Sequence, residues 1–190
     1  MNPLVTTLYD LYYPAGSPAR GILMRHSESV AQLALDINSR LPQPLDAGKV
    51  QTAAMLHDIG ICLTDAPGIG CHGTEPYIRH GILGADLLRR HGAPEWAARV
   101  AERHTGAGIN GADIAELGLP LPAERVMMPE SPLERLVCYA DKFYSKSGDM
   151  KRKPLERVRR SMQRHSLRTL ERFEALHNEF GPYNPEPTAL

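Results

Sequence analysis

The sequence lacks the features that would assign it to a special class of protein. Its 190 residues carry 22 Lys and Arg against 22 Asp and Glu, so no excess charge suggests binding to nucleic acid or an anionic membrane. No stretch approaches the roughly 18 apolar residues of a membrane-spanning helix. Residues 1–10 do not combine a basic region with an apolar run, so no signal peptide is expected. These absences predict a cytoplasmic protein with no membrane contact and no nucleic-acid partner.

Cysteine is also scarce. Cys62, Cys71 and Cys138 are an odd set without Cys-x-x-Cys spacing. Such a set favours free thiols in a reducing compartment over a disulfide framework. A bridge between Cys62 and Cys71 is the less favoured alternative.

What is present fits one globular domain, with 42% hydrophobic and 23% charged residues. The apolar residues recur at helical spacing, proline stands just inside several expected helix starts, and no useful alternating β pattern occurs. The sequence therefore predicts an all-α helical bundle. Helices are expected over residues 4–12, 18–37, 49–58, 77–90, 94–103, 132–146 and 154–180, with a short one at 113–117. The domain would cover 1–180, with a flexible tail at 181–190.

Two long irregular stretches, residues 60–77 and 107–130, separate the expected helices. Stretches of this length in a compact domain are usually functional or mobile, although a simple insertion remains open. The first contains Gly-x-Gly-x-x-Gly at 68–73, the dinucleotide-binding fingerprint. That fingerprint requires a strand before it and a helix opening at it, and neither is expected here. A flexible lid over a functional site is the favoured interpretation.

Histidine and aspartate carry the chemical signal. Six such residues lie on or next to the apolar faces of five expected helices: His26, His57, Asp58, His80, His104 and Asp141. One inward-facing histidine would normally be a hydrogen-bonded core residue, but six polar groups turned toward a core all need partners. A bound metal would satisfy them together, because imidazole and carboxylate are common metal ligands.

The order of these residues resembles the HD superfamily of metal-dependent phosphohydrolases, whose all-α fold agrees with the helical pattern. His57-Asp58-Ile59-Gly60 matches the His-Asp-Ile-Gly variant of its motif, and the resemblance covers about residues 20–146. It implies a first metal held by His26, His57, Asp58 and Asp141. It implies a second held by Asp58, His80 and His104, with Asp58 bridging.

Within the superfamily, His80 and His104 point to the binuclear branch. The strings His104-Thr105-Gly106 and Tyr139-Ala140-Asp141 are similar to those of the symmetrical diadenosine tetraphosphate hydrolases. The cyclic-di-GMP phosphodiesterases carry a further histidine where Thr105 stands here, and their Gly-Tyr-Pro element is absent. Cyclic di-GMP is therefore a poor substrate candidate.

Two divalent ions roughly 3.5–4 Å apart can lower the pKa of a shared water and orient the resulting hydroxide toward phosphorus. Mixed imidazole and carboxylate ligation suits Fe, Mn, Zn, Co or Ni, and the family favours Fe or Mn. The predicted function is metal-dependent hydrolysis of a phosphate ester or anhydride in a nucleotide-like small molecule. A dinucleoside polyphosphate hydrolase and a nucleotide-sensing regulatory module are the alternatives. The oligomeric state is not indicated.

Substrate phosphates need cations beyond the metals. Lys142 and Arg25 adjoin ligands in sequence and are the expected catalytic partners of Asp58. Lys146, Arg79 and His72 are expected substrate contacts. The remaining histidines, His91, His165 and His177, match no motif and are expected at the surface.

The segment from residue 151 to residue 172 holds nine Lys or Arg and two Glu, which makes the C-terminal helix basic and amphipathic. Such a helix can contact nucleic acid or membrane, but it more often packs on its own domain. The latter is expected here.

Overall fold

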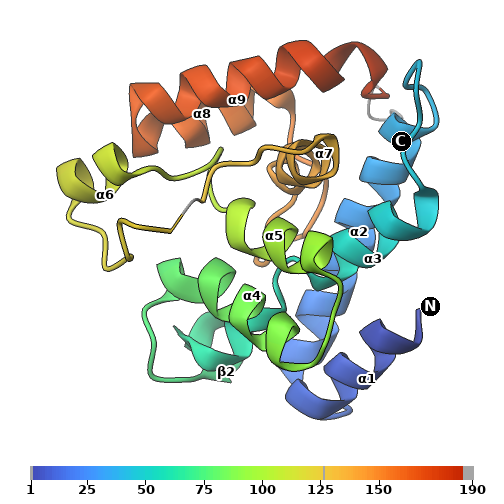
Figure 1. Cartoon of the computed structure of the whole chain (residues 1–190), viewed down its shortest axis with the longest axis vertical. Helices are drawn as coiled ribbons and strands as arrows, with labels where there is room; N and C mark the ends of the chain where they lie inside the picture. The colour runs from blue at the N-terminus through green and yellow to red at the C-terminus, as the bar shows by residue number, and fades with distance from the viewer. Residues whose placement is uncertain (1, 126, 186–190) are drawn as a thin grey trace.

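The computed structural model describes residues 2–125 and 127–185, and the expected all-α fold is confirmed. The helices are α1 (Pro3–Tyr12), α2 (Pro18–Asn38), α3 (Ala47–Leu56), α4 (His80–Arg90), α5 (Glu95–Arg103), α6 (Gly111–Leu117), α7 (Pro132–Asp141), α8 (Leu155–His165) and α9 (Leu167–Phe180). Short 3-10 turns are η1 (Ile59–Leu63), η2 (Pro67–Ile69), η3 (Tyr77–Arg79) and η4 (Gly181–Tyr183). Figure 1 shows the long α2 running beside α3, with α8 and α9 stacked above α7.

The helices begin where polar side chains satisfy their first backbone N–H groups. Ser17 accepts from the N–H of Arg20 at 3.2 Å and starts α2. Asp46 starts α3, and Ser131 starts α7 with Pro132 in the first helical position. Each cap satisfies donors that have no partner inside the helix, and each lies where the sequence predicts a helix start.

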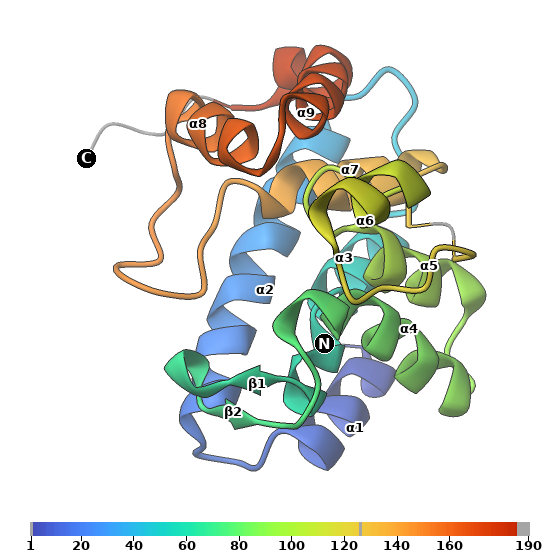
Figure 2. The same cartoon turned by 90° about the vertical axis from the view of Figure 1, so that its left-hand side faces the viewer.

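One continuous apolar core holds these helices together. It includes Val30 and Ala34 of α2, Leu56 of α3 and Leu136 of α7, all with essentially no exposed surface. A second, smaller cluster contains Ile82, Ile109, Ile114, Leu121 and Met127. It lies under α6, which both views place between α4 and the α8/α9 pair (Figures 1 and 2).

The expected single helix over 154–180 is wrong. The chain breaks at Ser166, whose φ of −172° and ψ of 162° are extended. Ser166 accepts a hydrogen bond from the N–H of Thr169 at 3.0 Å, so it caps α9. The chain then folds back, and Arg159 of α8 pairs with Glu174 of α9 at 2.8 Å. The break therefore lets α8 and α9 pack against each other as two separate helices (Figure 1).

The expected helix over 132–146 is too long, because α7 ends at Asp141. Residues 142–154 then form an irregular connection to α8, drawn in orange in Figure 2. This early end lets lysines on the connection approach the end of α7.

The two irregular stretches contain short elements. The first carries a two-stranded antiparallel hairpin, β1 (Asp65–Ala66) with β2 (Cys71–His72), and the glycine-rich segment lies in its turn. The second contains α6, close to the expected short helix. All three cysteines are free thiols. In the described part of the chain, no helix has the length and apolarity needed to cross a membrane. Residues 186–190 of the expected tail lie outside the described residues.

Candidate metal centre

The six predicted donor residues converge on one buried point, and five of them lie at the ends of elements. His26 projects from the middle of α2, His57 follows α3, and Asp58 precedes η1. The other three stand at helix ends: His80 opens α4, His104 follows α5, and Asp141 closes α7. None of the six residues exposes more than 8% of its surface.

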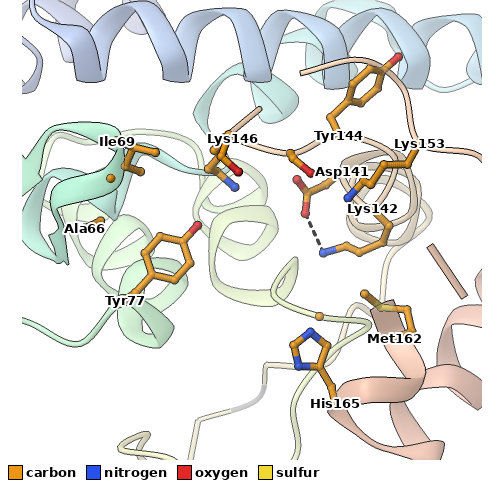
Figure 3. A pocket seen from close by; sticks show the side chains of 14 residues that line it. Ala66, Ile69, Tyr77, Asp141, Lys142, Tyr144, Lys146, Lys153, Met162 and His165 are labelled. Atoms are coloured by element: carbon orange, nitrogen blue, oxygen red, sulfur yellow. Dashed lines mark ion pairs between the residues drawn. The ribbon is translucent and has the colours of Figure 1, made fainter. Parts of the chain in front are cut away.

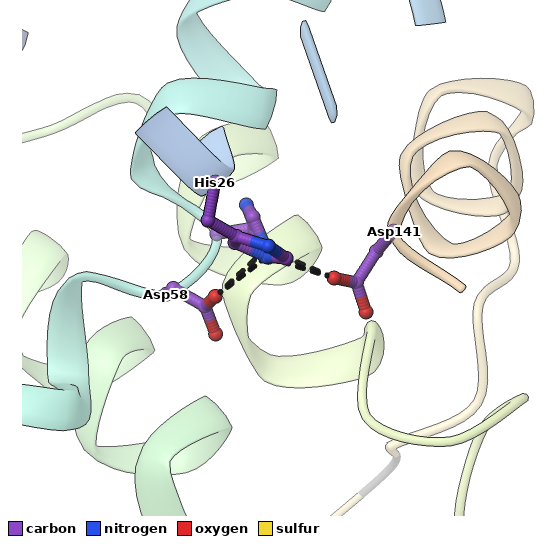
Figure 4. A group of neighbouring side chains, drawn as sticks. His26, Asp58 and Asp141 are labelled. Atoms are coloured by element: carbon purple, nitrogen blue, oxygen red, sulfur yellow. Dashed lines mark hydrogen bonds and ion pairs between the residues drawn. The ribbon is translucent and has the colours of Figure 1, made fainter. Parts of the chain in front are cut away.

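The first group contains His26, His57, Asp58 and Asp141 (Figure 4). The Nε2 atom of His26 lies 3.1 Å from the Oδ2 atom of Asp58 and 3.1 Å from the Oδ1 atom of Asp141. The Nε2 atom of His57 lies 3.0 Å from the same Asp58 oxygen. One donor atom from each residue lies within 4.8 Å of all the others.

The second group contains Asp58, His80 and His104, so Asp58 belongs to both. Nδ1 of His80 donates to the carbonyl of Tyr77 at 2.7 Å, and Nδ1 of His104 donates to that of Ala101 at 2.8 Å. A neutral imidazole whose proton is on Nδ1 presents a bare lone pair at Nε2. These two Nε2 atoms lie 3.1 Å apart.

Such an arrangement favours a bound cation. Oδ1 of Asp58 lies 3.5 Å and 3.3 Å from the Nε2 atoms of His80 and His104. Neither carboxylate oxygen of Asp58 accepts a well-formed hydrogen bond, although both are fully buried. Buried lone pairs that face one another are costly, and a shared metal ion would satisfy them more fully than the neighbouring cations do. The residues present therefore fit divalent metal ions.

The electrostatics favour the metal-binding protonation state at Asp58 and His80, but not at His57. Burial would raise the pKa of the Asp58 carboxyl, but His57 and Lys146 hold it well below its usual range. Burial, together with the neighbouring His104, lowers the pKa of His80 to about 3. Burial lowers the pKa of His57 too, but Asp58 and Asp141 outweigh it and raise that pKa to about 9. A metal must therefore displace a proton from His57 in binding.

Two lysines lie against the carboxylates. Nζ of Lys142 lies 2.7 Å from Oδ2 of Asp141 and donates to the carbonyl of His104 at 2.9 Å. Nζ of Lys146 lies 2.7 Å from Oδ2 of Asp58. Both lysines therefore lie at the centre, where a substrate phosphate could reach them.

Two cavities meet over the centre. The one we call the lysine lobe encloses about 420 Å³ and is lined by Lys142, Lys146 and Lys153 (Figure 3). The other, the apolar lobe, encloses about 320 Å³ and is lined by Ile78, Ile109, Leu117, Leu119 and by the second donor group's histidines. Both lobes share a boundary formed by Tyr77, Gly106, Asp141, Lys142, Lys146 and His165.

One predicted catalytic residue, Arg25, and two predicted substrate contacts, Arg79 and His72, lie elsewhere. Arg25 is exposed on the outer side of α2 and lines a separate cavity with Glu28 and Gln32. Arg79 is engaged by Glu75 at 2.6 Å, and neither lobe includes it. His72 is exposed on β2. Adjacency in sequence misplaces Arg25 because neighbouring residues on a helix point about 100° apart.

Two basic residues of the lining, Lys153 and His165, are not among the predicted site residues. Lys153 reaches the lysine lobe because α7 ends early. His165 is exposed, as the sequence predicts, but it also borders both lobes because the chain breaks at Ser166. Ser166 is a typical residue for the start of a helix, and this signal could have predicted the break.

The other two histidines lie away from the lobes. His91 is exposed and bonds to Tyr12. His177 is half-buried and contacts the hydroxyl of Tyr139 at 2.8 Å, so it is not a bare surface residue. Neither lines a lobe, in agreement with the absence of a motif around them.

A family model described as the HD domain matches residues 23–145. The chain belongs to the HD-domain family. That match contains all six donor residues and stops just before Lys146.

Three relatives share part of their length with the chain. A tRNA (cytidine(56)-2'-O)-methyltransferase of Thermoplasma volcanium is 36% identical over 169 residues, which cover 88% of this chain and 44% of the relative. A protein of the same name from Picrophilus torridus is 33% identical, with 67% and 33% covered. An uncharacterised protein of Methanocaldococcus jannaschii is 38% identical, with 60% and 59% covered. The chain therefore spans one third to three fifths of the length of these relatives.

Among solved structures, the HD domain of the L. monocytogenes phosphodiesterase PgpH in complex with cyclic-di-AMP superposes with a TM-score of 0.54 at 14% identity. The superposition covers 99% of this chain and 100% of that one. A second structure of the same HD domain gives 0.53, with 96% and 100% covered. At this identity the likeness shows the fold alone.

Proposed function

We propose that this HD-domain protein is a metal-dependent phosphohydrolase that cleaves a phosphate ester or anhydride bond of a nucleotide-like small molecule. The observation that carries the proposal is the pair of buried donor groups that share Asp58. One group offers two imidazoles and two carboxylates, and the other offers two imidazoles and the shared carboxylate. A pair of divalent ions, Fe or Mn in our proposal, would activate a water and neutralise phosphate oxygens there.

The protein's own groups would bind and orient the substrate. The ammonium group of Lys142 has three N–H donors, of which two are used by Asp141 and by the carbonyl of His104. The third is free for a phosphate oxygen. Lys146 adds a second positive charge beside Asp58, so both lysines favour the negative charge that grows on phosphate oxygens in the transition state.

The methyltransferase name of two relatives does not alter this assignment. The aligned region covers 44% and 33% of those relatives, which leaves more than half of each outside the alignment. The region aligned with the Thermoplasma volcanium protein covers 88% of this chain, enough to span positions 26–141 and with them all six donors. Methyl transfer can therefore reside in the remainder of those proteins, while the hydrolysis we propose belongs to the HD domain.

The test is a hydrolysis panel on protein loaded with Mn²⁺ or Fe²⁺, containing phosphomonoesters, phosphodiesters and diadenosine tetraphosphate. Product release from one class, with two metal ions per chain by elemental analysis, supports the proposal. Symmetrical cleavage of diadenosine tetraphosphate would select the dinucleoside polyphosphate alternative. Tight nucleotide binding without product from any compound would instead indicate the sensing module and contradict catalysis.

The matched variants are Asp58→Ala and Asp65→Ala. Asp58 is shared by both donor groups, whereas Asp65 is exposed on β1. We expect the first variant to lose metal and turnover together and the second to keep both. Full turnover by metal-free Asp58→Ala would refute the mechanism.

A further inference from the structure

The apolar lobe lies directly beside the cluster of His and Asp donors. Ile78, Ile109, Leu117 and Leu119 line it, and His80 and His104 lie at its inner side. Leu117 exposes 46% of its surface although it is a large apolar residue. Apolar side chains gathered in a cavity beside a few polar groups are typical of a ligand-binding site.

The apolar residues of the lobe are held in place by a small core of their own. Ile109 belongs to the second hydrophobic cluster and donates through its backbone N–H to the carbonyl of Met127 at 3.0 Å. Helix α6, which carries Leu117, is tied to α9 by two 2.8 Å bonds from Arg172 to Asp113. The lobe is therefore a preformed feature of the fold and not a gap between loose segments.

The two lobes differ in chemical character, one being positively charged and the other apolar. The lysine lobe offers Lys153, for which no ion pair exists among the described residues, in addition to Lys142 and Lys146 (Figure 3). The apolar lobe on the other side presents mainly hydrocarbon. A phosphate held at the shared boundary would project one substituent into each lobe, anionic on one side and apolar on the other.

The volume of the apolar lobe is suited to a ring-shaped substituent. A dry apolar cavity of about 150 Å³ is enough to bind benzene. The apolar lobe encloses about 320 Å³. Tyr77 lies on its boundary with the lysine lobe, and its ring stacks on the ring of His80 with the two ring centroids 4.8 Å apart. A single ring or a fused pair of rings fits such a space.

We propose that the apolar lobe is a specificity subsite that binds a ring-shaped apolar group attached to the substrate phosphate, and that Leu117 is one of its determining residues. The inference rests on the proposed function, because it takes the donor centre as the place where the phosphate lies. It narrows the substrate class to phosphates that carry an aromatic or similar ring and excludes inorganic polyphosphate and small alkyl phosphates as preferred substrates.

The test compares benzylphosphonate with methylphosphonate, which cannot be hydrolysed and which carry the same anionic group. Their affinities for the Mn²⁺-loaded full chain are measured by calorimetry. Burial of the ring should make benzylphosphonate bind about 10- to 100-fold more tightly than methylphosphonate. Since the readout is a ratio of affinities, the common phosphonate–metal contribution cancels.

Leu117→Asp is the variant and Leu11→Asp its control, because both leucines are exposed and only Leu117 lines the lobe. We expect the ratio to fall severalfold or more in Leu117→Asp and to stay at the wild-type value in Leu11→Asp. If Leu117→Asp does not fold by circular dichroism, Leu117→Ser replaces it with the same expectation.

Equal affinity for the two phosphonates, or an unchanged ratio in the folded Leu117 variant, would overturn the subsite. Hydrolysis has a separate outcome. Discrimination without turnover of any compound in the panel would leave the subsite standing and refute the enzyme. Turnover without discrimination would leave the enzyme and refute the subsite.

Discussion

Replacing Gly60 by alanine should disturb the second donor group more than the first. Gly60 lies in η1, two residues after Asp58, and its backbone packs against the backbone of α4. A Cβ atom at this position would lie 2.3 Å from the carbonyl oxygen of His80 and 2.3 Å from the backbone nitrogen of Gly84. Both neighbours are backbone atoms, so no flexible side chain can move aside.

The size of the disturbance follows from these distances. The contact must lengthen from 2.3 Å to at least 3.0 Å, which moves the start of α4 by about 0.7 Å relative to η1. Metal–ligand distances tolerate deviations of only about 0.2 Å. His80 moves with α4, whereas His26 and Asp141 belong to other helices and His57 directly follows α3. Overpacking of this kind also costs about 1–3 kcal/mol of stability.

The assay is elemental analysis of Mn²⁺-loaded protein after desalting, together with thermal unfolding. We expect Gly60→Ala to hold about one metal ion fewer per chain than the wild type and its Tm to drop by roughly 2–12 °C. Gly68→Ala is the matched control, because a Cβ atom there meets nothing within 4 Å and its φ is not positive. Wild-type metal content and a Tm within about 2 °C of wild type in Gly60→Ala would refute the packing argument.

Three further predictions concern the surroundings of the centre. Burial lowers the pKa of Lys153 to about 8. Calorimetric titration of the metal-loaded chain with pyrophosphate should therefore show affinity that falls as the pH rises through about 8. Lys153→Met should bind pyrophosphate weakly at every pH, without this fall near pH 8. Arg172→Gln removes two hydrogen bonds to Asp113 and should speed amide hydrogen exchange in α6 while leaving exchange in α7 unchanged. Exchange in α6 at the wild-type rate would show that these bonds do not hold α6 in place. Burial would raise the pKa of Glu134, but hydrogen bonds, including one from Arg103, lower it below 4.5, so this group stabilises the fold above pH 4.5 and the contribution is lost on acidification. Urea unfolding should therefore show that the free energy of unfolding falls less on acidification below pH 4.5 in Glu134→Gln than in wild type.

The sequence predicts the helices and the six donors because both depend on local signals. Ser17 and Ser131 cap α2 and α7 as expected, and His57 and Asp58 follow the apolar face of α3. Periodicity places such residues on the inner face of a helix whatever the tertiary arrangement. The order of the donors along the chain then suffices for the family.

Residues whose position depends on the path of the chain between helices are less predictable. Lys153 and His165 reach the centre only because α7 stops at Asp141 and the chain reverses at Ser166. Periodic apolar residues continue across both points, so a continuous helix is the natural expectation there. Arg25 shows the opposite case, since its adjacency to His26 does not survive the 100° rotation between neighbouring helical residues.

The spread of the donors along the chain has a consequence for how the protein acquires and loses its structure. The first group joins residue 26 to residue 141, and no two of its helices are neighbours in sequence except α2 and α3. An ion bound there would close a loop of more than half the chain, so it would act as a removable cross-link between the N-terminal and C-terminal halves. Because the unfolded chain offers no such site, metal binding should stabilise the folded state, and removing the metal should make the protein easier to digest by proteases.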